Sequence, residues 1–199
     1  MKKQILIIHG GTTFNTYKEY LTFLKNAKIS VEDFRPHSDW KDNLQKKLGN
    51  KFDVLQPSMP NKKNAKYKEW KIWFEKIIPL LDKEIVLIGH SLGGIFLSKY
   101  LSENKIPNKI TATFLVAAPY VDLKSKWLID FKLPRSSALF SQQSSKIYLI
   151  HSKDDLVVPF ADIKKYKRFL PDAMTEILSN RGHFRQETFP EIVKLIKSL

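Results

Sequence analysis

The stretch Ile88-Gly89-His90-Ser91-Leu92-Gly93-Gly94 governs the interpretation of the whole sequence. The residues before it, 84–88, are mostly apolar β-formers and predict a strand, and residues 92–102 predict a helix. A Gly-x-Ser-x-Gly pentapeptide between a strand and a helix is typical of a sharp turn that exposes the serine hydroxyl, because the glycines leave no Cβ where backbone and substrate come close. Ser91 is therefore the candidate nucleophile.

Strands and helices alternate along the rest of the chain. Apolar or β-branched runs predict further strands at residues 4–8, 52–56, 109–117, 146–151 and 174–178. Apolar residues at helical spacing predict further helices at residues 17–27, 40–48, 64–78, 159–169 and 186–197. This alternation favours an α/β fold, in which helices cover both faces of a mostly parallel sheet.

Two segments invite a functional interpretation. The helix at 64–78 has a stripe of large apolar residues, and their helical spacing favours a buried stripe over a binding surface; they are Tyr67, Trp70, Trp73, Phe74, Ile77 and Ile78. Residues 119–144 have no clean periodicity and predict a loop-rich excursion over the sheet. We expect that excursion to help form a substrate pocket.

Length and composition bound the class of protein. With 199 residues and no Pro/Ser/Gly-rich linker, the sequence predicts one domain spanning residues 1–199. It has no cysteine, which excludes disulfides, thiolate zinc sites and cysteine nucleophiles. The apolar run after the first lysines is too short for a signal peptide, and no stretch reaches the length of a membrane span. A cytoplasmic protein is the expectation.

The formal net charge of +14 raises the possibility of a polyanionic partner. Only five of the 34 basic residues are arginine, the residue that reads guanine edges, and the lysines are spread along the chain. The densest cluster, Lys62 to Lys71, matches the solvated side of an amphipathic helix. Nucleic-acid binding is therefore disfavoured, and steeply salt-dependent binding would indicate it.

A serine nucleophile needs a histidine base and a carboxylate that orients the base. His183 follows the last predicted strand, with Gly182 before it to let the loop turn, and is the best candidate base. The carboxylate is Asp154 or Asp155, directly after the strand at 146–151, although turn or capping chemistry explains an aspartate there equally well. In a parallel sheet all three loops lie at the carboxyl ends of the strands, where ligands bind.

The same chemistry needs amide donors for the oxyanion of the tetrahedral intermediate. The Leu92 amide opens the helix after Ser91, where the first N–H groups lack intrahelical partners. The second candidate is the Gly11 amide, in the loop after the first strand. The sequence has no phosphate-binding glycine motif and no metal-ligand motif, so no cofactor is expected.

Three motifs together carry a family resemblance: Gly89-His90-Ser91-Leu92-Gly93, Ser152-Lys153-Asp154-Asp155-x-x-Val158-Pro159 and Gly182-His183-Phe184. The chain resembles the small α/β-hydrolase family that includes retinoblastoma-binding protein nine and many bacterial serine hydrolases. The resemblance implies a three-layer fold with about six strands in the order 2-1-3-4-5-6 and no large lid domain, with Asp155 as the acid. The chain departs from the family at residues 17–49, where two helices and a connector replace about one helix. That insertion could shape the pocket mouth or a partner surface.

The resulting hypothesis is a carboxylesterase-type serine hydrolase that acts on small acyl esters or thioesters through Ser91, Asp155 and His183. The alternative is a non-catalytic interaction protein that retains the fold and binds a partner through its lysine-rich surface. A complete set of three catalytic groups weighs against the alternative, because a pure binder does not need them.

Overall fold

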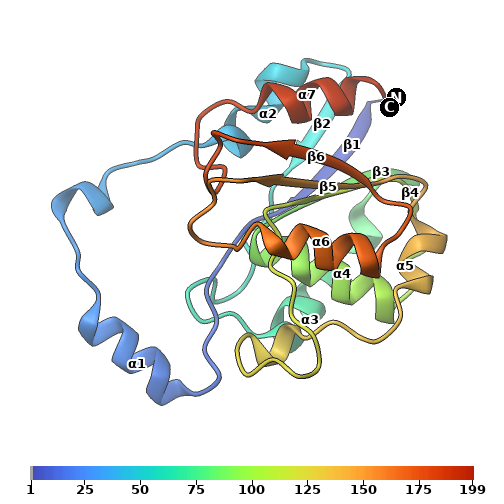
Figure 1. Cartoon of the computed structure of the whole chain (residues 1–199). Helices are drawn as coiled ribbons and strands as arrows, with labels where there is room; N and C mark the ends of the chain where they lie inside the picture. Colours follow the sequence, from blue (N-terminus) through green and yellow to red (C-terminus); the bar gives the residue numbers. More distant parts are fainter. Residues whose placement is uncertain (1) are drawn as a thin grey trace.

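The computed structural model describes residues 2–199, and within them six strands form one parallel sheet in the order β2-β1-β3-β4-β5-β6 (Figure 1). The strands are β1 (Lys3–Ile8), β2 (Phe52–Leu55), β3 (Glu84–His90), β4 (Lys109–Val116), β5 (Ile147–Ser152) and β6 (Met174–Leu178). Every neighbouring pair is parallel, which confirms the predicted strand order and fold class.

Alternation along the strands produces two cores, one on each face of the sheet. On β1, Leu6 and Ile8 belong to one apolar cluster, and Ile5 and Ile7 belong to the other. Successive side chains of a strand point to opposite faces, so a continuously apolar strand needs cover on both sides. The uninterrupted apolar run of β1 is thereby explained.

Helices supply that cover. The α-helices in the described residues are α1 (Tyr17–Asn26), α2 (Trp40–Leu48), α3 (Tyr67–Ile77), α4 (Leu92–Glu103), α5 (Ala138–Gln143), α6 (Ala161–Phe169) and α7 (Pro190–Lys197). Residues of α3, α4, α5 and α6 join one cluster, and residues of α2 and α7 join the other. Figure 1 shows α2 and α7 on one side of the sheet and α3 to α6 on the other. None of these helices has the length and apolarity of a transmembrane span.

Residues 17–34, which we call the arm, contain α1 and a short 3₁₀ helix, Val31–Phe34, and stand away from both layers (Figure 1). No residue of α1 is buried. Large apolar side chains of the arm are instead exposed, namely Tyr17, Leu21, Phe23, Leu24, Ile29, Val31 and Phe34. The arm is tied to the body near its start, where the Asn15 amide group donates a hydrogen bond to the Lys126 carbonyl at 3.0 Å.

The contrast between α1 and α2 gives a stability prediction. Leu44 on α2 is 1% exposed and packs in the core, whereas Leu24 on α1 is 44% exposed. We expect Leu44→Ala to lower the free energy of unfolding by about 2–5 kcal/mol, because it leaves a cavity, and Leu24→Ala to change it by less than about 0.5 kcal/mol. Urea unfolding of the two variants measures both values. A large loss in Leu24→Ala would contradict the exposure of the arm.

Several sequence-based expectations differ from the structure, among them the start of α7, which lies at Pro190 and not at residue 186. The segment 119–144 is not all loop, since it contains a 3₁₀ helix, Ile129–Phe131, and α5, whose Phe140 is fully buried. Helix α3 begins three residues later than expected, because Asn61 adopts φ 48° and a turn closes between Asn61 and Asn64. Trp73 lies on the solvent-exposed face of α3, where 43% of its surface is accessible, so it is not part of the buried stripe.

Candidate active site

Ser91 occupies the turn between β3 and α4 with φ 53° and ψ −122°. This is a strained conformation for a residue with a side chain, and strain of this kind concentrates at functional sites. The Ser91 amide donates a hydrogen bond of 2.8 Å to the Val116 carbonyl, which ties the turn to the neighbouring strand β4. The side chain is thereby presented at the carboxyl edge of the sheet.

The glycines around Ser91 permit very close backbone packing. A Cβ on Gly93 would lie 2.1 Å from the Ile8 carbonyl oxygen, and a Cβ on Gly89 would lie 2.6 Å from the Gly93 carbonyl oxygen. Neither contact is sterically possible, and both involve backbone atoms that have little freedom to move. The Gly-x-Ser-x-Gly pattern is therefore required by the packing of α4 on β1 and β3.

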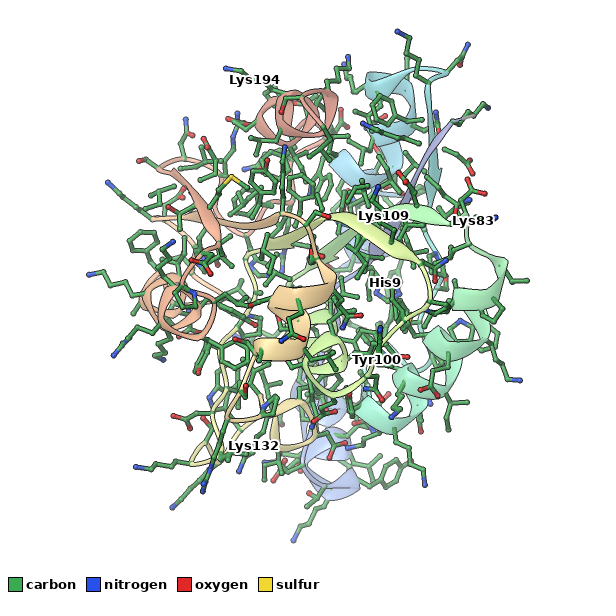
Figure 2. The ribbon with its side chains drawn as sticks, turned by 90° about the vertical axis from the view of Figure 1, so that its right-hand side faces the viewer. His9, Lys83, Tyr100, Lys109, Lys132 and Lys194 are labelled. Atoms are coloured by element: carbon green, nitrogen blue, oxygen red, sulfur yellow. The ribbon has the colours of Figure 1, made fainter. Side chains whose placement is uncertain are left out.

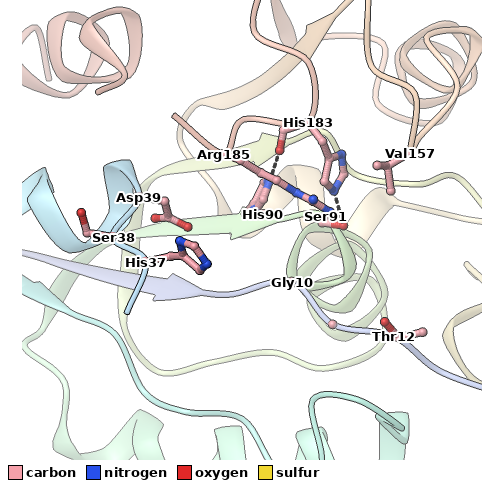
Figure 3. A pocket seen from close by; sticks show the side chains of 11 residues that line it. Gly10, Thr12, His37, Ser38, Asp39, His90, Ser91, Val157, His183 and Arg185 are labelled. Atoms are coloured by element: carbon pink, nitrogen blue, oxygen red, sulfur yellow. Dashed lines mark hydrogen bonds between the residues drawn. The ribbon is translucent and has the colours of Figure 1, made fainter. Parts of the chain in front are cut away.

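The structure brings Ser91, His183 and Asp155 together, although 92 residues separate the first two. The Ser91 Oγ lies 2.9 Å from the His183 Nε2 (Figure 3). The His183 Nδ1 lies 2.8 Å from the Asp155 Oδ2. A carboxylate only accepts hydrogen bonds, so the His183 Nδ1 carries the ring proton and donates a hydrogen bond to Asp155. The Nε2 of neutral His183 is then free to accept the Ser91 hydroxyl.

Asp155 is held as an ionised acceptor. Its Oδ1 accepts hydrogen bonds from the Val157 amide at 2.8 Å and the Val158 amide at 2.9 Å. Burial raises the pKa of Asp155, but the hydrogen bonds from His183 and the two amides outweigh burial and hold that pKa below its ordinary value. The carboxylate is thus fixed in position and in charge state.

The neighbouring Asp154 makes different contacts. It accepts hydrogen bonds from the Ser152 hydroxyl and from the Gly182 amide, the latter at 3.0 Å. These bonds join the loop after β5 to the loop that carries His183. Of the two aspartates left open by the turn motif, Asp155 is therefore the one that contacts His183, and Asp154 ties the two loops together.

His90 and Trp40 hold the backbone of the loop that carries His183, which we call the histidine loop. His90 Nε2 donates a hydrogen bond of 2.9 Å to the His183 carbonyl, and Trp40 Nε1 donates one of 3.0 Å to the Phe184 carbonyl. Both donors are buried, and their rings contact each other edge to face. The first residue of α2 therefore helps to position His183, a role that helical spacing alone does not reveal.

His90 gives the protein a pH-dependent stability. Burial, and then the charge of Lys41, hold the pKa of His90 well below the ordinary value of 6.5. The unfolded chain then binds more protons than the folded chain below pH 6.5, so the free energy of unfolding falls as the pH is lowered. We expect His90→Gln to reduce that fall by up to about 1.4 kcal/mol per pH unit. Urea unfolding at pH 7 and pH 5.5 measures it, and an unchanged pH slope would contradict the assignment.

The loop after β1 lies against Ser91. A Cβ on Gly10 would lie 3.1 Å from the Ser91 Cβ. His9 Nδ1 donates to the Gly10 carbonyl at 2.6 Å, while His9 Nε2 accepts the Met59 amide at 2.9 Å. The Gly10–Gly11 peptide is thereby oriented, and because the peptide is trans its N–H points opposite to its carbonyl.

A cavity of about 660 Å³ opens beside Ser91, and its wall includes Gly10, Gly11, His90 and His183. The remaining lining residues are Thr12, His37, Ser38, Asp39, Val157 and Arg185 (Figure 3). None of them belongs to residues 119–144, so the expectation that this excursion forms the pocket is wrong for this cavity. Residues 37–39 of the insertion supply part of the wall instead. The Trp40 amide donates a hydrogen bond to the Gln186 carbonyl at 2.8 Å, which holds the start of α2 beside the loop that carries His183.

The chain is similar to two proteins, one from a rat and one from a bacterium. Serine hydrolase RBBP9 of Rattus norvegicus is 28% identical over 157 residues, which cover 74% of this chain and 78% of that protein. YdeN of Bacillus subtilis (strain 168), named as a hydrolase, is 23% identical over 189 residues, which cover 94% of this chain and 88% of that protein.

Solved structures show the same fold. The ydeN gene product of Bacillus subtilis superposes with a TM-score of 0.77 at 21% identity, covering 99% of this chain and 98% of that chain. A thioesterase domain from the curacin biosynthetic pathway superposes with a TM-score of 0.64 at 12% identity, covering 98% and 91%. A sequence model of the serine hydrolases matches residues 33–197, which include Ser91, Asp155 and His183. The chain belongs to the serine hydrolase family.

Proposed function

We propose that the protein hydrolyses short carboxylic esters or thioesters through an acyl-enzyme on Ser91. The observation that carries the proposal is the hydrogen-bonded line from Ser91 Oγ to His183 Nε2 at 2.9 Å and from His183 Nδ1 to Asp155 at 2.8 Å. A serine hydroxyl is a weak nucleophile, and it becomes reactive when a base is positioned to take its proton. Family membership supports hydrolysis as the reaction class.

The acylation step follows from these contacts. Ser91 Oγ attacks the carbonyl carbon while His183 Nε2 takes the hydroxyl proton, and Asp155 stabilises the resulting imidazolium. His183 then protonates the leaving alcohol or thiol as its bond to the carbonyl carbon breaks. Water attacks the acyl-enzyme with His183 again as base, which releases the carboxylic acid and returns Ser91 to its hydroxyl form.

We propose the amides of Leu92 and Gly11 as the donors that stabilise the oxyanion. The Leu92 amide is at the first position of α4, where an N–H has no intrahelical acceptor. The Gly11 amide points away from the Gly10 carbonyl that His9 holds, and within the described residues it donates to no backbone or side-chain acceptor. The next amide, of Thr12, is already used by the Lys62 carbonyl at 2.8 Å, which favours Gly11 as the second donor.

Turnover of a graded panel tests the proposal. p-Nitrophenyl esters and the matching thioesters with acyl chains of two to eight carbons are assayed with the purified protein. We expect the highest kcat/KM for the shorter chains, because most of the residues that line the cavity of about 660 Å³ carry polar side chains. The absence of turnover for every member by a folded protein would exclude this function and favour a non-catalytic member of the family.

A further inference from the structure

Most of the residues that line the cavity beside Ser91 carry polar side chains. Apart from its two glycines and Val157, every residue that lines it carries a polar side chain. Long acyl chains bind in predominantly apolar pockets, whereas hydroxyl, imidazole and charged groups favour a substrate with polar groups of its own. The chemistry of the wall therefore points to a small polar substrate.

The one uncompensated fixed charge on this wall is positive. Asp39 contributes a carboxylate, but Asp39 also caps α2, where its carboxylate accepts the Lys41 amide at 2.8 Å and pairs with the Lys41 ammonium. Arg185 has no carboxylate within 4.0 Å and makes no side-chain hydrogen bond to any residue in 2–199. Its guanidinium is therefore free to bind a ligand.

Arg185 is presented by a fixed backbone. Phe184, which precedes it, is 1% exposed and adopts φ 54°, an unusual value for a bulky residue. The carbonyls on both sides of Arg185, those of Phe184 and Gln186, accept hydrogen bonds from Trp40 at 3.0 Å and 2.8 Å. Figure 3 shows the Arg185 side chain extending from this anchored loop into the cavity that contains Ser91.

We propose that Arg185 binds a carboxylate of the substrate, so that the substrate is a short ester or thioester carrying one carboxylate near its scissile carbonyl. This inference rests on the proposed function. A guanidinium forms two parallel charge-assisted hydrogen bonds with a carboxylate. The single positive charge matches one carboxylate, whereas a phosphate dianion would keep an uncompensated charge. The net charge of +14 also attracts anionic substrates to the protein, and Figure 2 shows its lysines at opposite ends of the molecule, with Lys194 at the top and Lys132 at the bottom.

Two matched pairs of chromogenic esters test the proposal. The first pair is mono-p-nitrophenyl adipate and its methyl ester, which differ by a carboxylate on the acyl side. The second pair is 3-carboxy-4-nitrophenyl butyrate and p-nitrophenyl butyrate, which differ by a carboxylate on the leaving group. We expect the wild-type protein to prefer the charged member of one pair in kcat/KM, and the preferred pair identifies which side of the scissile bond faces Arg185.

Variants then assign the preference to Arg185. In Arg185→Gln we expect the charged-to-neutral ratio of kcat/KM to fall about tenfold or more, and in Arg185→Lys we expect partial recovery, because lysine keeps the charge and loses the planar fork. Arg168→Gln on α6 removes the same charge outside the cavity and is expected to keep the wild-type ratio.

The outcomes separate this inference from the proposed function. If Arg185→Gln keeps the wild-type ratio for both pairs, or if Arg168→Gln lowers the ratio equally, the carboxylate contact is refuted while ester hydrolysis stands. If the wild-type protein hydrolyses no ester and a fluorophosphonate does not label Ser91, the proposed function and this inference fail together.

Discussion

Replacing Ser91 by alanine is expected to lower kcat for p-nitrophenyl acetate by about 10⁴–10⁶-fold. The variant keeps the amides of Gly11 and Leu92 and the cavity, but it lacks the atom that forms the acyl-enzyme. Alanine at φ 53° is no more strained than serine, so the elbow and the fold should persist. The residual rate reflects binding and oxyanion stabilisation alone.

Steady-state kinetics with circular dichroism as a folding control measure this effect. A matched control is Ser98→Ala, since Ser98 lies about two turns further along α4 and donates its hydroxyl to the Gly94 carbonyl at 2.8 Å, away from the candidate site. We expect Ser98→Ala to retain turnover. Equal activity in Ser91→Ala and wild type would remove Ser91 as the nucleophile.

Asp155→Asn is expected to lower kcat by about 10⁴-fold with little change in structure. The amide retains an oxygen that can accept the Val157 and Val158 amides, but it places an NH₂ group or a neutral oxygen opposite His183 Nδ1. The imidazole then loses the partner that fixes its tautomer and stabilises its positive charge. His183 Nε2 is no longer held ready to accept the Ser91 proton.

Asp154→Asn is the matched control for this prediction. Asp154 differs from Asp155 by one position and contacts the histidine loop through the Gly182 amide, without contacting His183 itself. We expect it to lower kcat by about tenfold or less, through a looser loop. Measuring kcat for both variants at pH 8 decides the assignment, and a larger loss in Asp154→Asn would assign the acid to Asp154.

The fold was predictable because local patterns and topology rules agree. Ile5 to Ile8 form a short, uninterrupted apolar run, which is typical of a strand covered on both faces, and the observed sheet has both faces covered. The predicted alternation of strands and helices allows few sheet topologies, because crossovers between parallel strands are almost always right-handed. The order 2-1-3-4-5-6 came from the family resemblance rather than from the patterns themselves.

Parts of the site were predictable for the same reason. Ser91, Asp155 and His183 each follow a strand, and the carboxyl ends of parallel strands share one edge. Sequence patterns alone left Asp154 and Asp155 open, since both suit a turn. The family resemblance implied Asp155, and the contact with His183 agrees with it. The insertion was expected to shape either the pocket mouth or a partner surface. Its individual wall residues, His37, Ser38 and Asp39, were not predictable, because their place depends on the long-range hydrogen bonds of Trp40.

The arm marks the limit of periodicity as a guide. Its apolar residues recur at helical spacing and α1 does form, capped by Thr16, whose hydroxyl accepts the Glu19 amide at 3.1 Å. The spacing predicts the helix but says nothing about whether another element lies close enough to cover it. In the described residues α1 has no buried side chain.

Labelling with a fluorophosphonate probe, followed by peptide mass spectrometry, tests the role of Ser91 most directly. The probe reacts with a serine only when a base activates it and an oxyanion site accepts the phosphonyl oxygen, so it needs no knowledge of the substrate. We predict a single adduct on Ser91 in the wild-type protein, strongly slowed labelling in Asp155→Asn and none in Ser91→Ala. A folded wild-type protein whose Ser91 stays unlabelled would contradict the assignment.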